Sequence, residues 1–236
     1  MKAVILAAGK GERLKGTAEG IPKPMITYGG KPILQHNIEL CKAHGIEEVY
    51  INTHHLASKI KQYFGDGGKF GVKILYSHES ELLGTSGALN SFREQLRNEN
   101  FYVIYGDNYS SYDLGLLKKV FDPVKCIGVV AFHHREDVSQ SGVGEFDEDG
   151  RIVRFLEKPA EGITESHWVN AGIYLLSSQI LDYIPSGFSD FGQDIFPRLL
   201  AEGVPLWSVR SSAEVKAFDT PELLRASLGG SNESKR

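Results

Sequence analysis

The segment KAVILAAGKGERL, residues 2–14, runs from an apolar stretch straight into small residues and glycines. The apolar residues predict a buried strand over 2–7, and the glycines predict a tight loop directly after it. In such a loop, backbone N–H groups can approach an anion closely. The segment is therefore a candidate phosphate-binding loop, although its glycine pair alone fits an ordinary turn equally well. It lacks the dinucleotide fingerprint, because Leu14 stands where G-x-G-x-x-G requires a glycine, and this argues against an NAD-dependent oxidoreductase.

Strand-like and helix-like segments alternate through the first half of the chain. We expect strands over 2–7, 48–52, 72–77 and 101–106, and helices over 33–44, 56–64 and 85–96. Gly45 ends the first of these helices. Parallel neighbouring strands need helical crossovers of this kind. The pattern predicts an α/β protein with a Rossmann-like, doubly wound, mostly parallel sheet.

The second half of the chain has a different rhythm. Strand-like runs follow one another, and the Asp149-Gly150 pair between two of them is a hairpin signal, so we expect an added antiparallel part. A further helix is expected over 190–201, with four apolar residues facing inward: Phe191, Ile195, Leu199 and Leu200. No linker interrupts residues 1–228, which we expect to form a single domain, and the polar tail 229–236 is expected to be disordered.

Composition limits the classes of function. The 236 residues are 41% hydrophobic and carry a formal net charge of −4, which excludes whole-chain disorder and argues against nucleic acid as a partner. No apolar run approaches the length of a membrane span or a secretory signal, so no membrane association is expected. The two cysteines, Cys41 and Cys126, sit among apolar neighbours and are expected to be buried thiols of a cytoplasmic protein. The eight histidines follow no zinc-site spacing.

A second candidate phosphate-binding feature follows the glycine loop. In Ile21-Pro22-Lys23-Pro24-Met25, two prolines restrict the backbone on either side of Lys23, so that one cation can be aimed at one place. A lone Pro-Lys-Pro is usually just a rigid loop. Its position soon after LAAGKGERL gives it more weight.

Together with further motifs, these two segments resemble the sugar-phosphate nucleotidyltransferases, and the resemblance covers roughly residues 1–225. The matching strings, in chain order, are LAAGKGERL (6–14), PKP (22–24), LGTSGAL (83–89), YGD (105–107), EKP (157–159), NAG (170–172) and DFGQDIFP (190–197). The family joins a nucleoside triphosphate to a sugar 1-phosphate and releases pyrophosphate. The resemblance implies the fold of the nucleotide-diphospho-sugar transferases, these two substrates as partners, and Mg²⁺ as the cofactor. The residues allow a homo-oligomer without specifying one.

The resemblance also implies roles for individual residues. Arg13, Lys23, Asp107 and Lys158 are the expected catalytic residues, with Arg13 and Lys23 on the triphosphate, Mg²⁺ on Asp107, and Lys158 on the sugar-linked phosphate. The expected nucleotide-binding residues are Leu6, Ala7, Ala8, Gly9, Gly11, Gly84, Thr85, Ser86 and Gly87. The expected sugar-binding residues are Gly106, Glu157, Lys158, Asn170 and Gly172. At Gly84 and Gly87, the absence of a Cβ would let a base or ribose lie against the backbone; Glu79 and Glu81, just upstream, are less certain members of this site.

Three questions stay open at this stage. The family's second metal-binding aspartate aligns with Ala217, so Asp219 is either the second ligand or the N-cap of a last helix. Loss of that ligand would suit a non-catalytic binding module. Lys15 also departs from the family pattern after Arg13. The segment 189–200 is most similar to guanylyltransferases of mannose- or heptose-type sugar phosphates, whereas residues 63–77 look equally like uridylyltransferases; we expect guanylyl transfer first, with uridylyl or thymidylyl transfer next, and no C-terminal β-helix.

Overall fold

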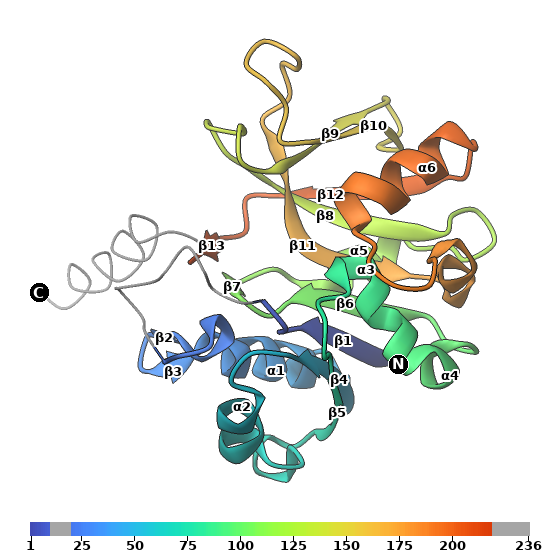
Figure 1. Ribbon diagram of the computed structural model, residues 1–236. Coiled ribbons are helices and arrows are strands. Elements are labelled where there is room, and N and C mark those ends of the chain that lie inside the picture. The colour runs from blue at the N-terminus through green and yellow to red at the C-terminus, as the bar shows by residue number, and fades with distance from the viewer. Residues whose placement is uncertain (10–19, 219–236) are drawn as a thin grey trace, which may run out of the picture.

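The computed structural model in Figure 1 describes residues 1–9 and 20–218. Nine strands form one mixed sheet, in the order β10-β9-β11-β6-β1-β4-β5, with β8 paired to both β11 and β12. The strands of this sheet are β1 (Lys2–Leu6), β4 (Glu48–Thr53), β5 (Lys73–His78), β6 (Phe101–Tyr105), β8 (Gly128–His134), β9 (Gly142–Phe146), β10 (Ile152–Glu157), β11 (Trp168–Leu176) and β12 (Leu206–Ser211). Two small two-stranded sheets are β2 (Thr27–Tyr28) with β3 (Lys31–Pro32) and β7 (Asn108–Ser110) with β13 (Val215–Ala217).

Short helices cover the sheet. They are α1 (Ile33–Ala43), α2 (Ala57–Phe64), α3 (Gly84–Gly87), α4 (Arg93–Leu96), α5 (Leu114–Val120) and α6 (Phe196–Ala201). Single turns of tighter or wider helix are η2 (Lys23–Met25), η3 (Gly68–Phe70), η4 (Ala88–Phe92), η5 (Ser178–Tyr183) and η6 (Phe191–Ile195). Gly45, at φ +71°, follows the end of α1, as its position in the sequence predicts. Within the described ranges, no helix is both long and apolar enough to cross a bilayer.

Strand β1 lies at the centre of the parallel part, between β4 and β6. Its side chains alternate between two apolar cores: Ile5 packs with residues of α1, and Val4 packs with residues of η4 and α4. Both side chains are fully buried, and each such burial stabilises the fold by roughly 1.5–3 kcal/mol. Helices on both faces of parallel strands confirm the doubly wound α/β prediction.

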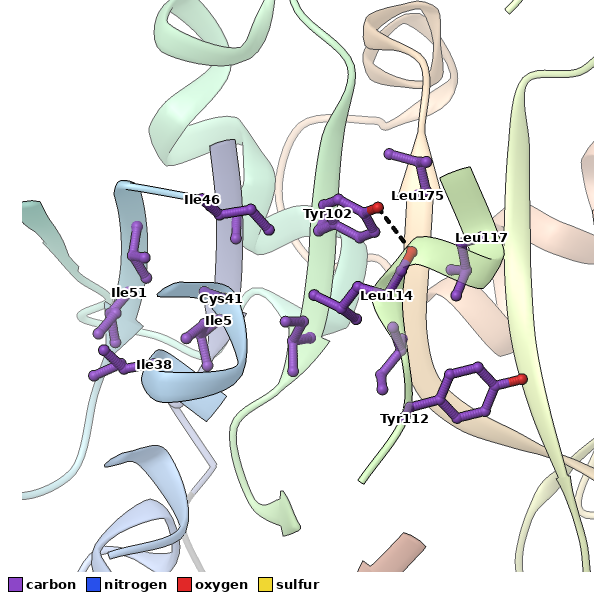
Figure 2. Packing of buried hydrophobic residues seen from close by; sticks show 14 of the residues in the cluster. Ile5, Ile38, Cys41, Ile46, Ile51, Tyr102, Tyr112, Leu114, Leu117 and Leu175 are labelled. Atoms are coloured by element: carbon purple, nitrogen blue, oxygen red, sulfur yellow. Dashed lines mark hydrogen bonds between the residues drawn. The ribbon is translucent and has the colours of Figure 1, made fainter. Parts of the chain in front are cut away.

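Figure 2 shows the first of these cores. Ile38 and Cys41 of α1 lie beside Ile5 and Ile51. The Tyr102 hydroxyl donates a hydrogen bond of 3.0 Å to the carbonyl of Leu114, so the one polar atom of that side chain is satisfied within the core. Both cysteines are buried free thiols, as expected, and burial raises the pKa of the Cys41 thiol to about 12.

The second half adds the antiparallel part. β11 pairs antiparallel with β6, β8 and β9, and β9 and β10 form the expected hairpin, which projects from one end of the molecule in Figure 1. In its turn, Gly150 adopts φ +88° and its N–H donates to the carbonyl of Asp147. The Asp149-Gly150 signal is therefore confirmed.

The predictions of two helices, over 85–96 and 190–201, are wrong in detail. Residues 84–96 form α3, a tight turn and α4 instead of one helix, although Leu89, Phe92 and Leu96 are buried as expected. Here tertiary contacts override the helical period, because this segment packs along residues 185–189. The Asn90 side chain donates a hydrogen bond to the carbonyl of Pro185.

The segment 190–201 begins with a wide π-type turn, Phe191–Ile195, before α6. Pro197 has no N–H to donate back to residue 193, so an α-helical ladder cannot run through this point. Phe191, Ile195 and Leu199 face inward, whereas Leu200 is only partly buried.

The strand order places the β1–β6 pair where the sheet changes direction. From β1 the chain moves outward to β4 and β5, then returns to the other side of β1 to form β6. In sheets of this kind, ligands bind beyond the carboxyl ends of the strands at that reversal. The loops after Leu6 and Tyr105 meet there, since the N–H of Gly106 donates 2.8 Å to the carbonyl of Leu6.

Candidate active site

Two adjoining cavities open beyond the carboxyl ends of β1 and β6. The β1 lobe has a volume of about 280 Å³ and the β8 lobe about 470 Å³. Four residues line both lobes: Thr85, Tyr105, Asp107 and Asp190. The two lobes are therefore neighbouring halves of one cleft, with these side chains at the boundary.

The β1 lobe is walled mainly by apolar and small residues. Leu6, Ala8 and Gly9 line it from the end of β1, and Leu82, Gly84 and Phe188 line it from the other side. The neighbouring Ala7 is held by the 2.8 Å hydrogen bond that its N–H donates to the Asn52 side chain. Thus four of the expected nucleotide-binding residues, Leu6 to Gly9, lie in or directly beside one lobe.

A buried carboxylate, Glu79, is one of the polar groups that line this lobe. Glu79 is only 3% exposed. One of its oxygens accepts 2.8 Å from Asn52 Nδ2, and the other accepts 3.0 Å from the N–H of Leu83. Each carboxylate oxygen keeps a second lone pair, so Glu79 can still accept hydrogen bonds from a ligand.

Lys23 and Asp107 come together at the cleft. Lys23 Nζ lies 3.7 Å from Asp107 Oδ2, and the lysine side chain is 12% exposed. The backbone around Lys23 is fixed by the prolines and by a 2.8 Å hydrogen bond from the N–H of Met25 to the carbonyl of Pro22. The end of the glycine turn at Gly9, the braced cation and Asp107 thus meet at one place. Gly11 and Arg13 lie outside the described residues.

Gly84 and Gly87 lack room for a side chain because the backbone of residues 187–189 packs against them. A Cβ on Gly84 would lie 2.3 Å from the carbonyl oxygen of Ser189, and a Cβ on Gly87 would lie 2.4 Å from that of Gly187. The missing side chains therefore admit the protein's own backbone at these sites. The N–H groups of Ser86 and Gly87 both donate 3.0 Å to the Ser189 carbonyl. Of the segment 84–87, Gly84 and Thr85 line the cleft.

The β8 lobe is polar and contains two of the expected sugar-binding side chains, Glu157 and Asn170. Asn170 donates 2.7 Å to the Tyr174 hydroxyl and accepts 2.9 Å from the N–H of Gly172, so its side chain is held in one orientation. Gly172, at φ +69°, lies against the ring of Tyr105, where a Cβ would come within 2.7 Å of a ring carbon. Gly106 likewise has no room for a Cβ, which would lie 2.8 Å from the Leu6 carbonyl oxygen.

Glu157 is held in a narrow space. A Cβ on Gly142 would lie 2.9 Å from Glu157 Oε2, and a Cβ on Gly192 would lie 2.6 Å from the same atom. Burial raises the pKa of Glu157 above its usual value, and the negative charge of Asp190 adds to the rise, while Lys158 opposes it. The carboxylate form therefore carries a cost in the folded protein.

Lys158 is exposed and directly follows β10. Its φ of +50° makes it one of two non-glycine residues with left-handed backbone among residues 1–9 and 20–218. Such a conformation is costly for lysine, and costly backbone conformations gather at functional sites. Its N–H donates 3.0 Å to the carbonyl of Ser141, which lines the β8 lobe, so the lysine backbone borders that lobe.

Two residues of the cleft were not predicted from the sequence: His133, on β8, and Arg135, directly after it. His133 and Arg135 line the β8 lobe. Burial, together with the charges of Arg135 and His134, lowers the pKa of His133 to about 4, so its imidazole is neutral at pH 7 and Arg135 is the cation. β8 runs parallel to β6, because each is antiparallel to β11. Their position at the end of an apolar strand was the available signal.

The region of the expected second metal ligand is only partly described. β13 pairs with β7 so that Ala217 stands opposite Asn108, the residue after Asp107, and both line the β8 lobe. Asp219 lies outside the described residues. Within the part that is described, no cluster of three or more His, Cys, Asp or Glu side chains could hold a metal ion. Asp107 alone still suits Mg²⁺, which binds through one or two protein carboxylates and completes its shell with water and phosphate oxygens.

Glu157 supports a prediction about stability. Because its folded-state pKa is raised, protonated Glu157 is favoured at low pH, and stability is lost as pH rises through the raised value. We expect Glu157→Gln to raise the melting temperature at pH 8, with a smaller gain at pH 5, because pH 5 lies close to the usual value of 4.5, where only a small part of this loss has occurred. Thermal melts across this range measure it. The exposed Glu161→Gln is the control, and an equal gain at both pH values would contradict the prediction.

Comparisons with known proteins agree with this geometry. The family model for nucleotidyl transferase matches residues 2–214. A UTP–glucose-1-phosphate uridylyltransferase of Synechocystis is 38% identical over 91% of this chain and 59% of its own length. A mannose-1-phosphate guanylyltransferase of Mycobacterium tuberculosis is 34% identical over 85% of this chain, so the chain spans between half and two thirds of both relatives. The structure of a putative glucose-1-phosphate thymidylyltransferase from Bacillus anthracis superimposes with a TM-score of 0.88 at 26% identity, covering 99% of this chain and 96% of that one. The chain belongs to the nucleotidyl transferase family.

Proposed function

We propose that this protein transfers a nucleotidyl group from a nucleoside triphosphate to a sugar 1-phosphate, with GTP and a mannose- or heptose-type sugar phosphate as the preferred pair. The observation that carries the proposal is the two-lobed cleft. An apolar lobe that follows the glycine turn suits a nucleoside, and a polar lobe suits a sugar. Asp107 lies at their junction, with Lys23 3.7 Å from it, where the phosphates of both substrates would meet.

In the proposed reaction, an oxygen of the sugar phosphate attacks the α-phosphorus of the triphosphate. A new phosphorus–oxygen bond forms, the bond to the β-phosphate oxygen breaks, and pyrophosphate leaves. The second ionisation of a phosphate monoester lies near pH 6, so the nucleophile is already charged at neutral pH and needs no general base. The work left to the protein is to orient two anions and to stabilise the charge on the leaving group.

The cations of the cleft divide this work. Lys23, held against Asp107, is placed to contact the leaving phosphates. Arg135 and Lys158 border the β8 lobe and would hold the sugar-linked phosphate, which the triphosphate otherwise repels. Asp107 would hold Mg²⁺, which when bound supplies charge neutralisation on the phosphates.

The β1 lobe supports the choice of guanine. The Watson–Crick edge of guanine presents two adjacent donors, the N1–H and the N2 amino group, whereas uracil presents one N–H between two carbonyl oxygens. The buried Glu79 carboxylate can only accept hydrogen bonds. It would attract the guanine edge and repel the uracil carbonyls. The 38% identity to a uridylyltransferase makes UTP the competing substrate.

A substrate panel tests the proposal. Pyrophosphate release is measured with Mg²⁺ for GTP, UTP, dTTP, CTP and ATP, each combined with mannose, glucose and heptose 1-phosphates. We expect the highest kcat/KM for GTP with a mannose- or heptose-type sugar. Preference for UTP with glucose 1-phosphate would overturn the choice of base and sugar. No turnover with any pair, despite nucleotide binding, would support the non-catalytic binding module that Ala217 favours.

Lys23 provides a test of the mechanism. Loss of one preorganised charge stabiliser costs about 10²–10³-fold in kcat, so we expect a fall of that size in Lys23→Ala. Steady-state kinetics with the preferred pair measure it. The matched control is Lys31→Ala, whose ammonium pairs with Glu39. An unchanged kcat in Lys23→Ala would remove this residue from the mechanism.

Glu79 provides a test of base selection. Glu79→Gln keeps the size of the side chain but replaces one acceptor oxygen with a donor. We expect the ratio of kcat/KM for GTP to that for UTP to fall about tenfold, the size of one charge-assisted hydrogen bond. Glu161→Gln, at an exposed position that lines neither lobe, is the matched control. An unchanged ratio in a variant with a normal melting temperature would exclude Glu79 from base recognition.

A further inference from the structure

Phe188 is exposed at the edge of the cleft. It is 64% exposed, and among residues 1–9 and 20–218 it is the one phenylalanine that leaves its ring largely in water. Water contact with so much apolar surface is unfavourable. The ring nevertheless lines the β1 lobe. A ligand seated in that lobe would remove it from water.

The segment that carries Phe188 is fixed to residues 83–87, on the same wall of the lobe. The next residue, Ser189, is 1% exposed. Its N–H donates 2.9 Å to the carbonyl of Leu83, its carbonyl accepts from the N–H groups of Ser86 and Gly87, and its hydroxyl accepts 2.8 Å from that of Ser86. Because these bonds fix the backbone on one side of Phe188, its ring is presented at the mouth of the lobe without a further ordering step.

Two further hydrogen bonds join Thr85 to the residues that follow Ser189. The Thr85 hydroxyl donates 2.8 Å to Asp190 and accepts 2.9 Å from the N–H of Phe191. The hydrogen bonds between residues 83–87 and 189–191 therefore hold Phe188 in place from the side of the β1 lobe. An exposed phenyl ring on a backbone so firmly held differs from a loose surface loop.

The distance between the Phe188 ring and Gly84 shows which way the ring points. A Cβ built on Gly84, whose φ is +76°, would lie 3.2 Å from Phe188 Cε2. The edge of the ring thus lies beside the Gly84 backbone, and both line the β1 lobe. The lobe's other apolar wall comes from Leu6 and Ala8 at the end of β1. A flat group entering between these walls would meet the phenyl ring.

We propose that Phe188 packs against the nucleobase of the bound triphosphate and so sets the affinity for the nucleotide. This inference rests on the proposed function. Stacking on an aromatic ring tolerates every base, because every base has a π-face. Phe188 therefore strengthens binding of GTP and UTP alike, whereas the choice between them lies with Glu79.

The test is direct nucleotide binding, measured by calorimetry for GTP and for UTP without sugar phosphate. Loss of one stacked base corresponds to about tenfold weaker binding, so Phe188→Ala should raise both dissociation constants by about that factor. Phe188→Trp should retain wild-type affinity. Phe188→Leu, which keeps apolar volume without a ring, should resemble Phe188→Ala. Val124→Ala, at a 92% exposed apolar position outside the cleft, is the control.

Steady-state kinetics separate this inference from the function on which it rests. In Phe188→Ala, we expect a higher KM for the triphosphate with kcat and the KM for sugar phosphate within about twofold of wild type. Unchanged nucleotide affinity in an active protein, full recovery by Phe188→Leu, or an equal rise in both KM values would overturn the role of Phe188 and leave the proposed function standing. A wild-type protein that binds no triphosphate would overturn the proposed function as well.

Discussion

The burial of β1 on both faces is the constraint on which the arrangement of the cleft depends. Val4 and Ile5 are fully covered by two separate cores, so the strand can be neither moved to an edge nor shifted by one residue without exposing them. The end of β1 is then fixed beside the end of β6. The loop that begins at Ala7 consequently meets Asp107, which follows β6, at the reversal point of the sheet.

A second contact joins the two halves of the chain across the cleft. Ser189 accepts two backbone hydrogen bonds from the last two residues of α3, and this is possible because Gly84 and Gly87 carry no side chains at the point of approach. Thr85 and Asp190, which are hydrogen-bonded to each other, line both lobes. The walls of the β1 lobe and the β8 lobe are therefore parts of one connected unit.

The parts of this structure that could be predicted from the sequence are those set by local pattern. Period-two and helical spacing located the parallel strands, α1 and α2, and Asp149-Gly150 located the hairpin. The prolines around Lys23 and the strand before Asp107 indicated two groups that the structure brings within 3.7 Å. Long-range packing could not be predicted from the sequence. The segment 84–96 forms three short pieces instead of one helix because it packs along residues 185–189. Arg135 was missed although it directly follows an apolar strand, and Phe188 was missed because nothing local separates a cleft phenylalanine from any other.

Three unfavourable local features gather around the same cleft. Glu157 is a carboxylate whose burial raises its pKa, Lys158 adopts a left-handed backbone, and Phe188 leaves a phenyl ring in water. Each carries a free-energy cost in the protein without a ligand, and at Glu157 the neighbouring Lys158 offsets only part of it. Under the proposed function, an anionic sugar phosphate would supply a partner for Lys158, hydroxyl donors would satisfy Glu157, and a nucleobase would cover Phe188. The costs are distributed over both lobes, so under the proposed function they are fully relieved only when both lobes hold a ligand.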